Sequence, residues 1–136
     1  MLLLAFVCAC VFVPAPYAVG NGIFICKAGD LFIRTELFFG LGRAEGPDVT
    51  EGEFQEFLVH IVTPRFPDGL TVLTGRGQFR NSSGVIEREP SKLVIILYPP
   101  DLENADWKIE RIREEYKERF QQESVLRADS TACVSF

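Results

Sequence analysis

The residue types that most often perform chemistry are scarce in this chain. Its single histidine, His60, follows Glu56 by one turn on the polar side of a predicted helix, a position typical of a solvated side chain. No cysteine or serine nucleophile stands beside it, so no catalytic triad can be built. Beyond the first 18 residues there are too few His and Cys for a zinc or copper centre, and no loop has EF-hand spacing. We predict no catalytic residue, no metal site and no cofactor.

Arg34, Glu36 and Phe38 alternate along a predicted strand and therefore share one of its faces. An arginine and a glutamate on a mostly apolar face could form an acid/base pair, a ligand clamp or an ion pair between two subunits. We favour the ion pair between subunits. The predicted ligand or partner surface combines residues of this strand, of a proline-bounded turn and of a later strand: Arg34, Glu36, Phe38, Arg65, Val94, Ile96 and Tyr98.

The glycine-rich segment 40–46 lies between a predicted strand and a predicted helix, where phosphate-binding loops also lie. Glu45 occupies the place of the third glycine of the dinucleotide fingerprint, and the helix begins only after Thr50. We interpret the segment as a flexible connection in which Arg43 could contact an anion.

Composition places the chain among acidic single-domain proteins. It has 136 residues, 47% of them hydrophobic, and a formal net charge of −5. Its basic residues are interleaved with acidic ones and form no stripe, so nucleic acid is excluded as a partner.

The N-terminus has the pattern of an export signal. The apolar run from Leu2 to Val13 is too short for a membrane-spanning helix, which needs about 20 residues, and small residues follow it. No basic residue precedes it, and an N-terminal element of the fold is the alternative. We predict a leader over 1–18, an arm over 19–30 and a domain over 31–136. Cys10, after Ala9, is a lipidation candidate, although two incidental cysteines in a discarded leader would explain Cys8 and Cys10 equally well.

Removal of the leader would leave Cys26 and Cys133, one near each end of the domain. Two cysteines in an exported chain favour one disulfide, which would close a loop of about 100 residues and contribute up to ~4–5 kcal/mol. The alternative is two free, buried thiols.

The predicted elements alternate as strand, helix, strand, strand, helix, strand. Strands are expected over 31–39, 70–80, 92–98 and 124–128, the last with a second piece over 131–136. Helices are expected from Thr50, where Glu53 completes a capping box, and over 104–121. This is the β-α-β-β-α-β order of a ferredoxin-like α+β sandwich, an antiparallel sheet with two helices on one face. Because strand 92–98 is apolar on both faces, something must cover the second face: a second subunit, the arm or an apolar ligand. We favour a homodimer.

Three segments resemble a bacterial family known only as domain of unknown function 3574: Thr35–Leu41, Val62–Val72 and Gln122–Arg127. The closing Cys133–Phe136 is similar too, so the resemblance covers about residues 26–136. It implies a small exported protein, periplasmic or lipid-anchored in a Gram-negative envelope, and it supports the leader and the pairing of Cys26 with Cys133. The family brings no established activity.

Two functions remain after this reading. The first is a non-catalytic envelope protein that binds a small apolar ligand or an envelope protein and touches the membrane only through its leader or a lipid anchor. The second is a small enzyme of the dimeric α/β-barrel type, in which Arg34, Glu36 or Arg65 would point into an apolar cavity on the sheet. We favour the first.

Overall fold

The computed structural model describes residues 26–136, so the predicted leader, Cys10 and the first part of the arm lie outside the described residues. The elements follow in the order β1 (Asp30–Gly40), α1 (Glu51–Phe57), the π-helix η1 (Leu58–Val62), β2 (Thr71–Arg80), β3 (Ile86–Tyr98), α2 (Ala105–Phe120) and β4 (Leu126–Val134). No helix among these residues is both long and apolar enough to span a membrane.

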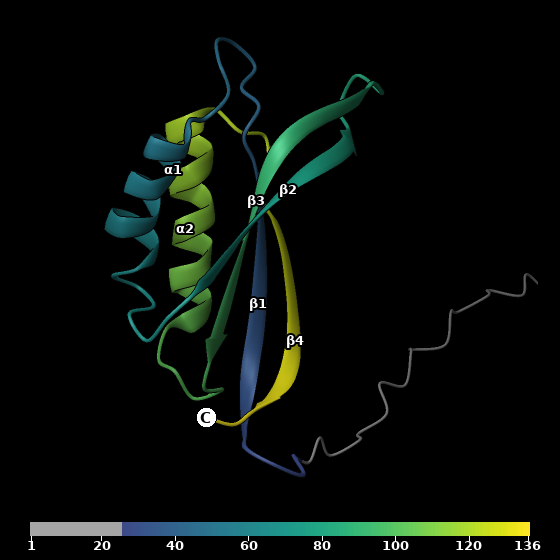
Figure 1. Cartoon of the computed structure of the whole chain (residues 1–136). Coiled ribbons are helices and arrows are strands. Elements are labelled where there is room, and N and C mark those ends of the chain that lie inside the picture. The colour runs from purple at the N-terminus through teal and green to yellow at the C-terminus, as the bar shows by residue number, and fades with distance from the viewer. Residues whose placement is uncertain (1–25) are drawn as a thin grey trace, which may run out of the picture.

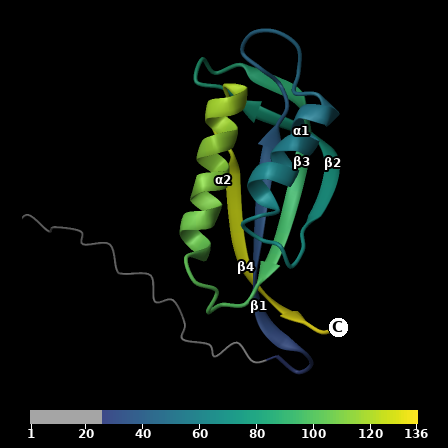
Figure 2. The same cartoon turned by 90° about the vertical axis from the view of Figure 1, so that its left-hand side faces the viewer.

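The four strands form one antiparallel sheet in the order β2-β3-β1-β4, with β3 and β1 in the centre. Both helices pack on the same side of the sheet, and no helix formed by residues 26–136 covers the other side (Figures 1 and 2). The predicted ferredoxin-like α+β fold is therefore confirmed. β3 begins six residues earlier than predicted, and β4 is one strand rather than two pieces.

The core lies between the helices and the sheet. The odd-numbered side chains of β1 and the even-numbered side chains of β3 meet the apolar face of α2 there, and Leu37, Phe39 and Ile96 are fully buried. Tyr116 of α2 stands at the centre of an aromatic cluster, with ring centroids 4.6 Å from Phe39 and 4.8 Å from Phe120. Burial of such large rings dominates the stability of a small domain.

The start of α1 is set by the predicted capping box. The Thr50 hydroxyl accepts from the Glu53 backbone amide at 3.2 Å, and the Glu53 carboxylate accepts from the Thr50 amide at 2.9 Å. Glu53 also accepts from Arg43 at 2.6 Å. The Thr50 amide, together with Arg43, lowers the pKa of Glu53 to about 2 from 4.5.

The charge on Glu53 is expected to contribute stability that depends on pH. Because its pKa is lower in the folded chain, that contribution is complete above about pH 4.5 and is lost as the pH falls toward 2. Glu53→Gln should therefore be less stable than wild type at pH 7, with a difference in melting temperature that shrinks over this range. Glu118→Gln removes an exposed carboxylate from α2 and is the control. A difference that stays constant down to pH 2 would contradict this account.

The predicted first helix continues as a single π-helical turn. The Thr63 amide donates to the Leu58 carbonyl at 2.8 Å, five residues back. Phe54, Phe57 and Leu58 are buried, Ile61 is partly buried, and His60 is exposed, as its position on the polar side of the helix predicts.

The chain ends of the described domain lie together at one end of the sheet (Figure 1). A disulfide joins Cys26 to Cys133, whose Cα atoms are 5.5 Å apart, as the cysteine count predicts. Gly29 lets the chain enter β1 beside β4: its φ is 76°, and a Cβ at this position would overlap the Val134 carbonyl.

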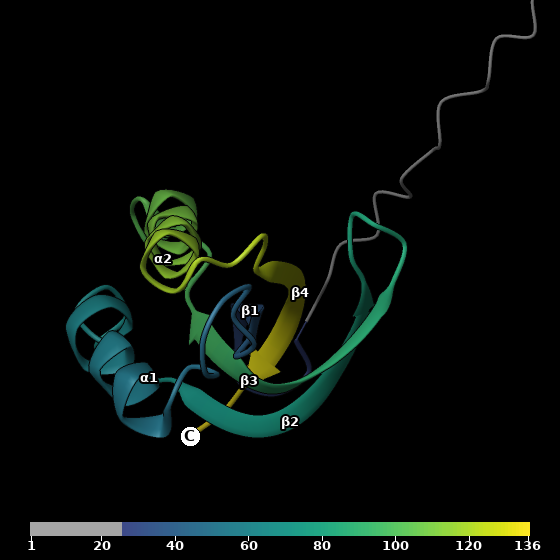
Figure 3. The same ribbon diagram turned by 90° about the horizontal axis from the view of Figure 1, so that it is seen from above.

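At the other end of the sheet, the hairpin between β2 and β3 bends away from the helices. Figure 3 shows its tip on the side of β4 that the helices leave open. Gly75 and Gly77 lie in the bending part of β2, where missing side chains permit strong twist. The second face of the sheet is therefore concave.

Candidate functional site

The helix-free face of the sheet, called here the open face, has apolar side chains in register across all four strands. Phe38 of β1 lies opposite Leu93 of β3 and Leu126 of β4, and Leu73 of β2 lies opposite Leu93. Phe38 is 37% exposed, Leu73 49% and Leu126 60%. Large apolar side chains therefore remain accessible across the open face among residues 26–136.

Arg34 and Glu36 occupy the middle of the open face, as their alternation with Phe38 predicted. The Arg34 Nε and Nη2 atoms donate to one Glu36 oxygen at 2.8 and 2.6 Å. Their side chains are 37% and 27% exposed. Opposite them stand Leu97 and Ile95 of β3. The pair leaves this part of the face with no net charge.

Val94, Ile96 and Tyr98 do not belong to the open face, and that part of the predicted surface is wrong. Their side chains point toward the helices: Val94 and Ile96 are 0% exposed, and Tyr98 is 6% exposed. β3 has two apolar faces, so its sequence alone could not show which set is covered. The open face carries its alternate residues Leu93, Ile95 and Leu97 instead.

Tyr98 joins a polar group beneath α2. Its hydroxyl lies 3.0 Å from the Thr35 hydroxyl, and Thr35 donates to Asp129 of β4 at 2.5 Å. Beside this group, Arg127 binds Asp106 at 2.6 Å and Glu110 at 2.8 Å. Burial alone would lower the pKa of the Arg127 guanidinium, but these hydrogen bonds raise it above its ordinary value. The network fastens α2 to β4.

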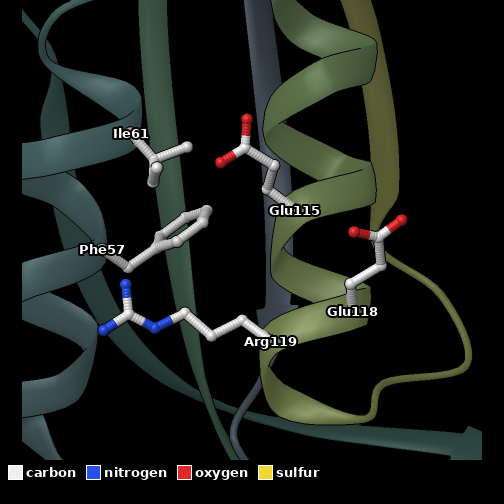
Figure 4. A pocket seen from close by; sticks show the side chains of 5 residues that line it. All are labelled: Phe57, Ile61, Glu115, Glu118 and Arg119. Carbon is white, nitrogen blue, oxygen red and sulfur yellow. The ribbon is translucent and has the colours of Figure 1, made fainter.

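Arg65 lies on the helix side of the molecule, away from Arg34 and Glu36. It donates to the Ile61 carbonyl at 2.7 Å and to Glu115 of α2 at 2.6 Å. Next to it is a cavity of about 350 Å³ between α1 and α2, whose lining residues Figure 4 shows: Phe57, Ile61, Glu115, Glu118 and Arg119. Arg65 therefore connects η1 to α2 and shares no surface with the other predicted residues.

The larger cavity, of about 650 Å³, lies at the end of the sheet opposite the disulfide (Figure 1). We call it the end cavity. Its walls are the end of β1 with the glycine-rich segment, the bent part of the β2–β3 hairpin, and the connection from α2 to β4. Arg34 and Glu36 are not among its lining residues, so this cavity is not the one in which the alternative enzyme would place them.

Glu89 of β3 is the most constrained acid of the end cavity. Its Oε2 atom accepts from the Gly42 amide at 2.7 Å, and a Cβ at Gly40 would overlap its carboxylate. Burial raises the pKa of Glu89; the Gly42 amide opposes that rise, and the charges of Glu87 and Asp48 add to it. Glu89 was not predicted from the sequence, where its only signal is the pair of glycines, Gly40 and Gly42, that make room for it.

The predicted anion contact, Arg43, already has an ion-pair partner within the protein. Arg43, proposed as an anion contact, binds Glu53 at 2.6 Å and lies over the Phe120 ring at 5.6 Å. Among residues 26–136, no group of three or more His, Cys, Asp or Glu side chains is placed to hold a metal ion.

Fold and surface together define a disulfide-linked ferredoxin-like domain with one helix-covered and one open sheet face. The chain belongs to the DUF3574 family of proteins of unknown function, whose model matches residues 34–136. This confirms the resemblance seen in the sequence. No curated protein matches the chain.

Solved structures share this fold. A phage SAM lyase in complex with S-methyl-5'-thioadenosine superposes with a TM-score of 0.59 at 20% identity, covering 83% of this chain and 97% of the lyase. A phage SAM lyase in the apo state gives 0.56 at 19% identity, covering 83% and 98%. The periplasmic divalent cation tolerance protein CutA from Archaeoglobus fulgidus gives 0.48 at 10% identity, covering 73% and 81%. At these identities the likeness is one of fold alone.

Proposed function

We propose that this protein is a non-catalytic binding domain of the bacterial envelope that pairs with a second copy of itself through the open face. The observation that carries the proposal is the exposed row formed by Leu73, Leu93, Phe38 and Leu126 across the whole sheet. Water-exposed apolar area of this extent is stabilised by burial against a complementary surface.

Charge favours a second copy as the occupant. The chain has a net charge of −5, so two copies repel at most approaches. The centre of the open face is neutral, because Arg34 and Glu36 compensate each other. A two-fold axis near Thr35 would set Arg34 of each copy against Glu36 of the other, an arrangement that is self-complementary.

Export agrees with the disulfide between Cys26 and Cys133, since disulfides persist in oxidising compartments. Cys26 is bonded to Cys133, which pairs with Leu31 at the start of β1, whereas the end cavity is lined by Phe38 and Gly40 at the other end of this strand. A leader or lipid anchor attached before Cys26 would therefore turn the end cavity away from the membrane, and it would leave the open face accessible to a second copy.

The test is the oligomeric state of Leu97→Lys. Leu97 lies opposite Arg34 on the open face and does not line the end cavity. A lysine there puts like charges at the centre of the interface, and we expect the dimer dissociation constant to rise at least about tenfold. Light scattering during gel filtration of the oxidised protein measures the mass over a concentration series.

Val59→Lys is the matched control, because Val59 is 51% exposed on η1, on the helix side. Leu73→Lys repeats the test on the edge strand β2, where a folding defect is less of a concern. The proposal predicts a dimer for wild type and Val59→Lys and a weakened dimer for both open-face variants, with circular dichroism unchanged. A wild-type monomer at all concentrations, or equal effects of all three lysines, would refute it.

A further inference from the structure

The end cavity has a pronounced excess of negative charge. Four carboxylates line it, and none of them forms an ion pair with any of residues 26–136; they are Asp48, Glu87, Glu89 and Glu123. Glu87 accepts from the Asn81 amide at 2.6 Å, and Glu89 accepts from the Gly42 amide at 2.7 Å. Neutral donors of this kind hold the carboxylates in place without cancelling their charge.

The two arginines of the end cavity do not balance these acids. Arg43 is neutralised by Glu53, which lies outside the cavity lining. Arg88, which lines the cavity, donates to the neutral Gln78 at 3.2 Å, so a single guanidinium without an acidic partner stands against the four carboxylates. The field inside the cavity is therefore attractive to cations.

Apolar side chains line the same space. Phe38 and Leu126 stand side by side at the cavity end of the open face, and Phe79 lies opposite Glu87 on the bent hairpin. Phe79 is 41% exposed. Aromatic faces next to carboxylates bind organic cations, because the ring faces carry negative potential and the hydrocarbon part of the ligand loses contact with water.

A bare metal ion does not fit these residues. The described part of the chain places no three carboxylate, His or Cys side chains close enough to share one ion. A volume of about 650 Å³ is also that of a small-molecule pocket rather than of an ion site.

We propose that the end cavity binds a small organic cation, an ammonium-type group attached to an aromatic or apolar body. The cationic group lies at Glu89 and Glu87, and the body packs against Phe38, Phe79 and Leu126. This inference shares Phe38 and Leu126 with the proposed dimer interface, so each proposal is tested at residues that the other does not use. The two proposals can be refuted independently of each other. Leu97 and Leu73, which test the dimer, are outside the cavity lining. Glu89, which tests the cavity, is at the strand end beyond the neutral centre of the open face.

The experiment is a titration of the oxidised, isotope-labelled protein with phenethylammonium, followed by the backbone amide signals of Gly42, Gly77 and Phe79. We expect saturable shifts of these signals with a dissociation constant on the order of 1 mM for so small a probe. The neutral 2-phenylethanol and the anionic phenylacetate carry the same ring, and both should bind at least about tenfold more weakly.

Glu89→Gln tests the position of the cation. Its amide oxygen can still accept from Gly42, so the loop is retained while the charge is removed. We expect an approximately tenfold weaker affinity for phenethylammonium and no change for 2-phenylethanol. Glu118→Gln changes the net charge equally on the outer side of α2 and should bind as wild type does. Equal affinities for amine and alcohol, no shifts at the three amides, or an unchanged Glu89→Gln would overturn the proposal.

Discussion

Cys133→Ser is expected to lower the free energy of unfolding by about 4–5 kcal/mol, the largest effect of any change at the chain ends. The disulfide links residues 107 positions apart, and in the chain-entropy model a closed loop of this length restricts the unfolded chain by about that amount. It also holds residues 26–29 against the end of β4, where Leu31 pairs with Cys133. Urea unfolding of the oxidised protein measures the difference.

Reduction supplies the control for this prediction. Wild type treated with a reductant should become as unstable as Cys133→Ser, and the reductant should leave the variant unchanged. Cys26→Ser should match Cys133→Ser, because both remove the same bond. An unfolding midpoint that is the same in oxidised wild type and in the serine variants would contradict a structural role for the disulfide.

Tyr116→Ala should destabilise the domain by about 3–5 kcal/mol, the range for removal of a large buried aromatic side chain. Tyr116 is fully buried, and its ring packs against Phe39, Phe54, Phe57 and Phe120. Its loss would leave a cavity where α1, α2 and β1 meet. Thermal and urea unfolding at pH 7 check this value.

Tyr116→Phe separates packing from hydrogen bonding. The Tyr116 hydroxyl donates to the Gly40 carbonyl at 2.7 Å, and phenylalanine keeps the ring while losing this bond, at a cost of about 1–2 kcal/mol. Gly40 adjoins Glu89 in the end cavity, so this variant should also shift the Gly42 amide signal. Equal losses in Tyr116→Ala and Tyr116→Phe would mean that the aromatic cluster contributes little.

The disulfide and the end cavity lie at opposite ends of the same two central strands. β1 runs from the Gly29 turn beside the disulfide to Gly40 at the cavity. The proposed binding site is thus at the end of β1 opposite the disulfide. Its loops are joined to the core by the Tyr116 hydroxyl, which donates to the Gly40 carbonyl, and by the Gln122 side-chain amide, which donates to the Gly42 carbonyl.

Local signals in the sequence were sufficient for the order of elements. The Thr50 and Glu53 capping box fixed the start of α1, because the two groups that satisfy each other are three residues apart. Alternation along β1 placed Arg34, Glu36 and Phe38 on one face correctly. The position of Cys26 and Cys133 near the two ends of the domain predicted the disulfide, and three segment resemblances predicted the family.

Other features depend on contacts between distant segments, and only the tertiary structure determined them. β3 is apolar on both faces, so only its pairing with β1 and the packing of α2 assign Val94, Ile96 and Tyr98 to the core. The π-helical turn and the attachment of Arg65 to Glu115 likewise need α2 beside η1.

The end cavity is the clearest case of a feature that depends on tertiary contacts rather than on local sequence signals. Its lining comes from β1, the hairpin and the α2–β4 connection, which the bend of the hairpin brings together. Glu89 contacts Gly42 across 47 positions of sequence. By itself, the sequence determined the elements, their order and the polarity of β1, because these follow from neighbours within a few residues. The tertiary structure decided which faces are covered and where acids gather, since register and strand twist arise only when the whole sheet forms.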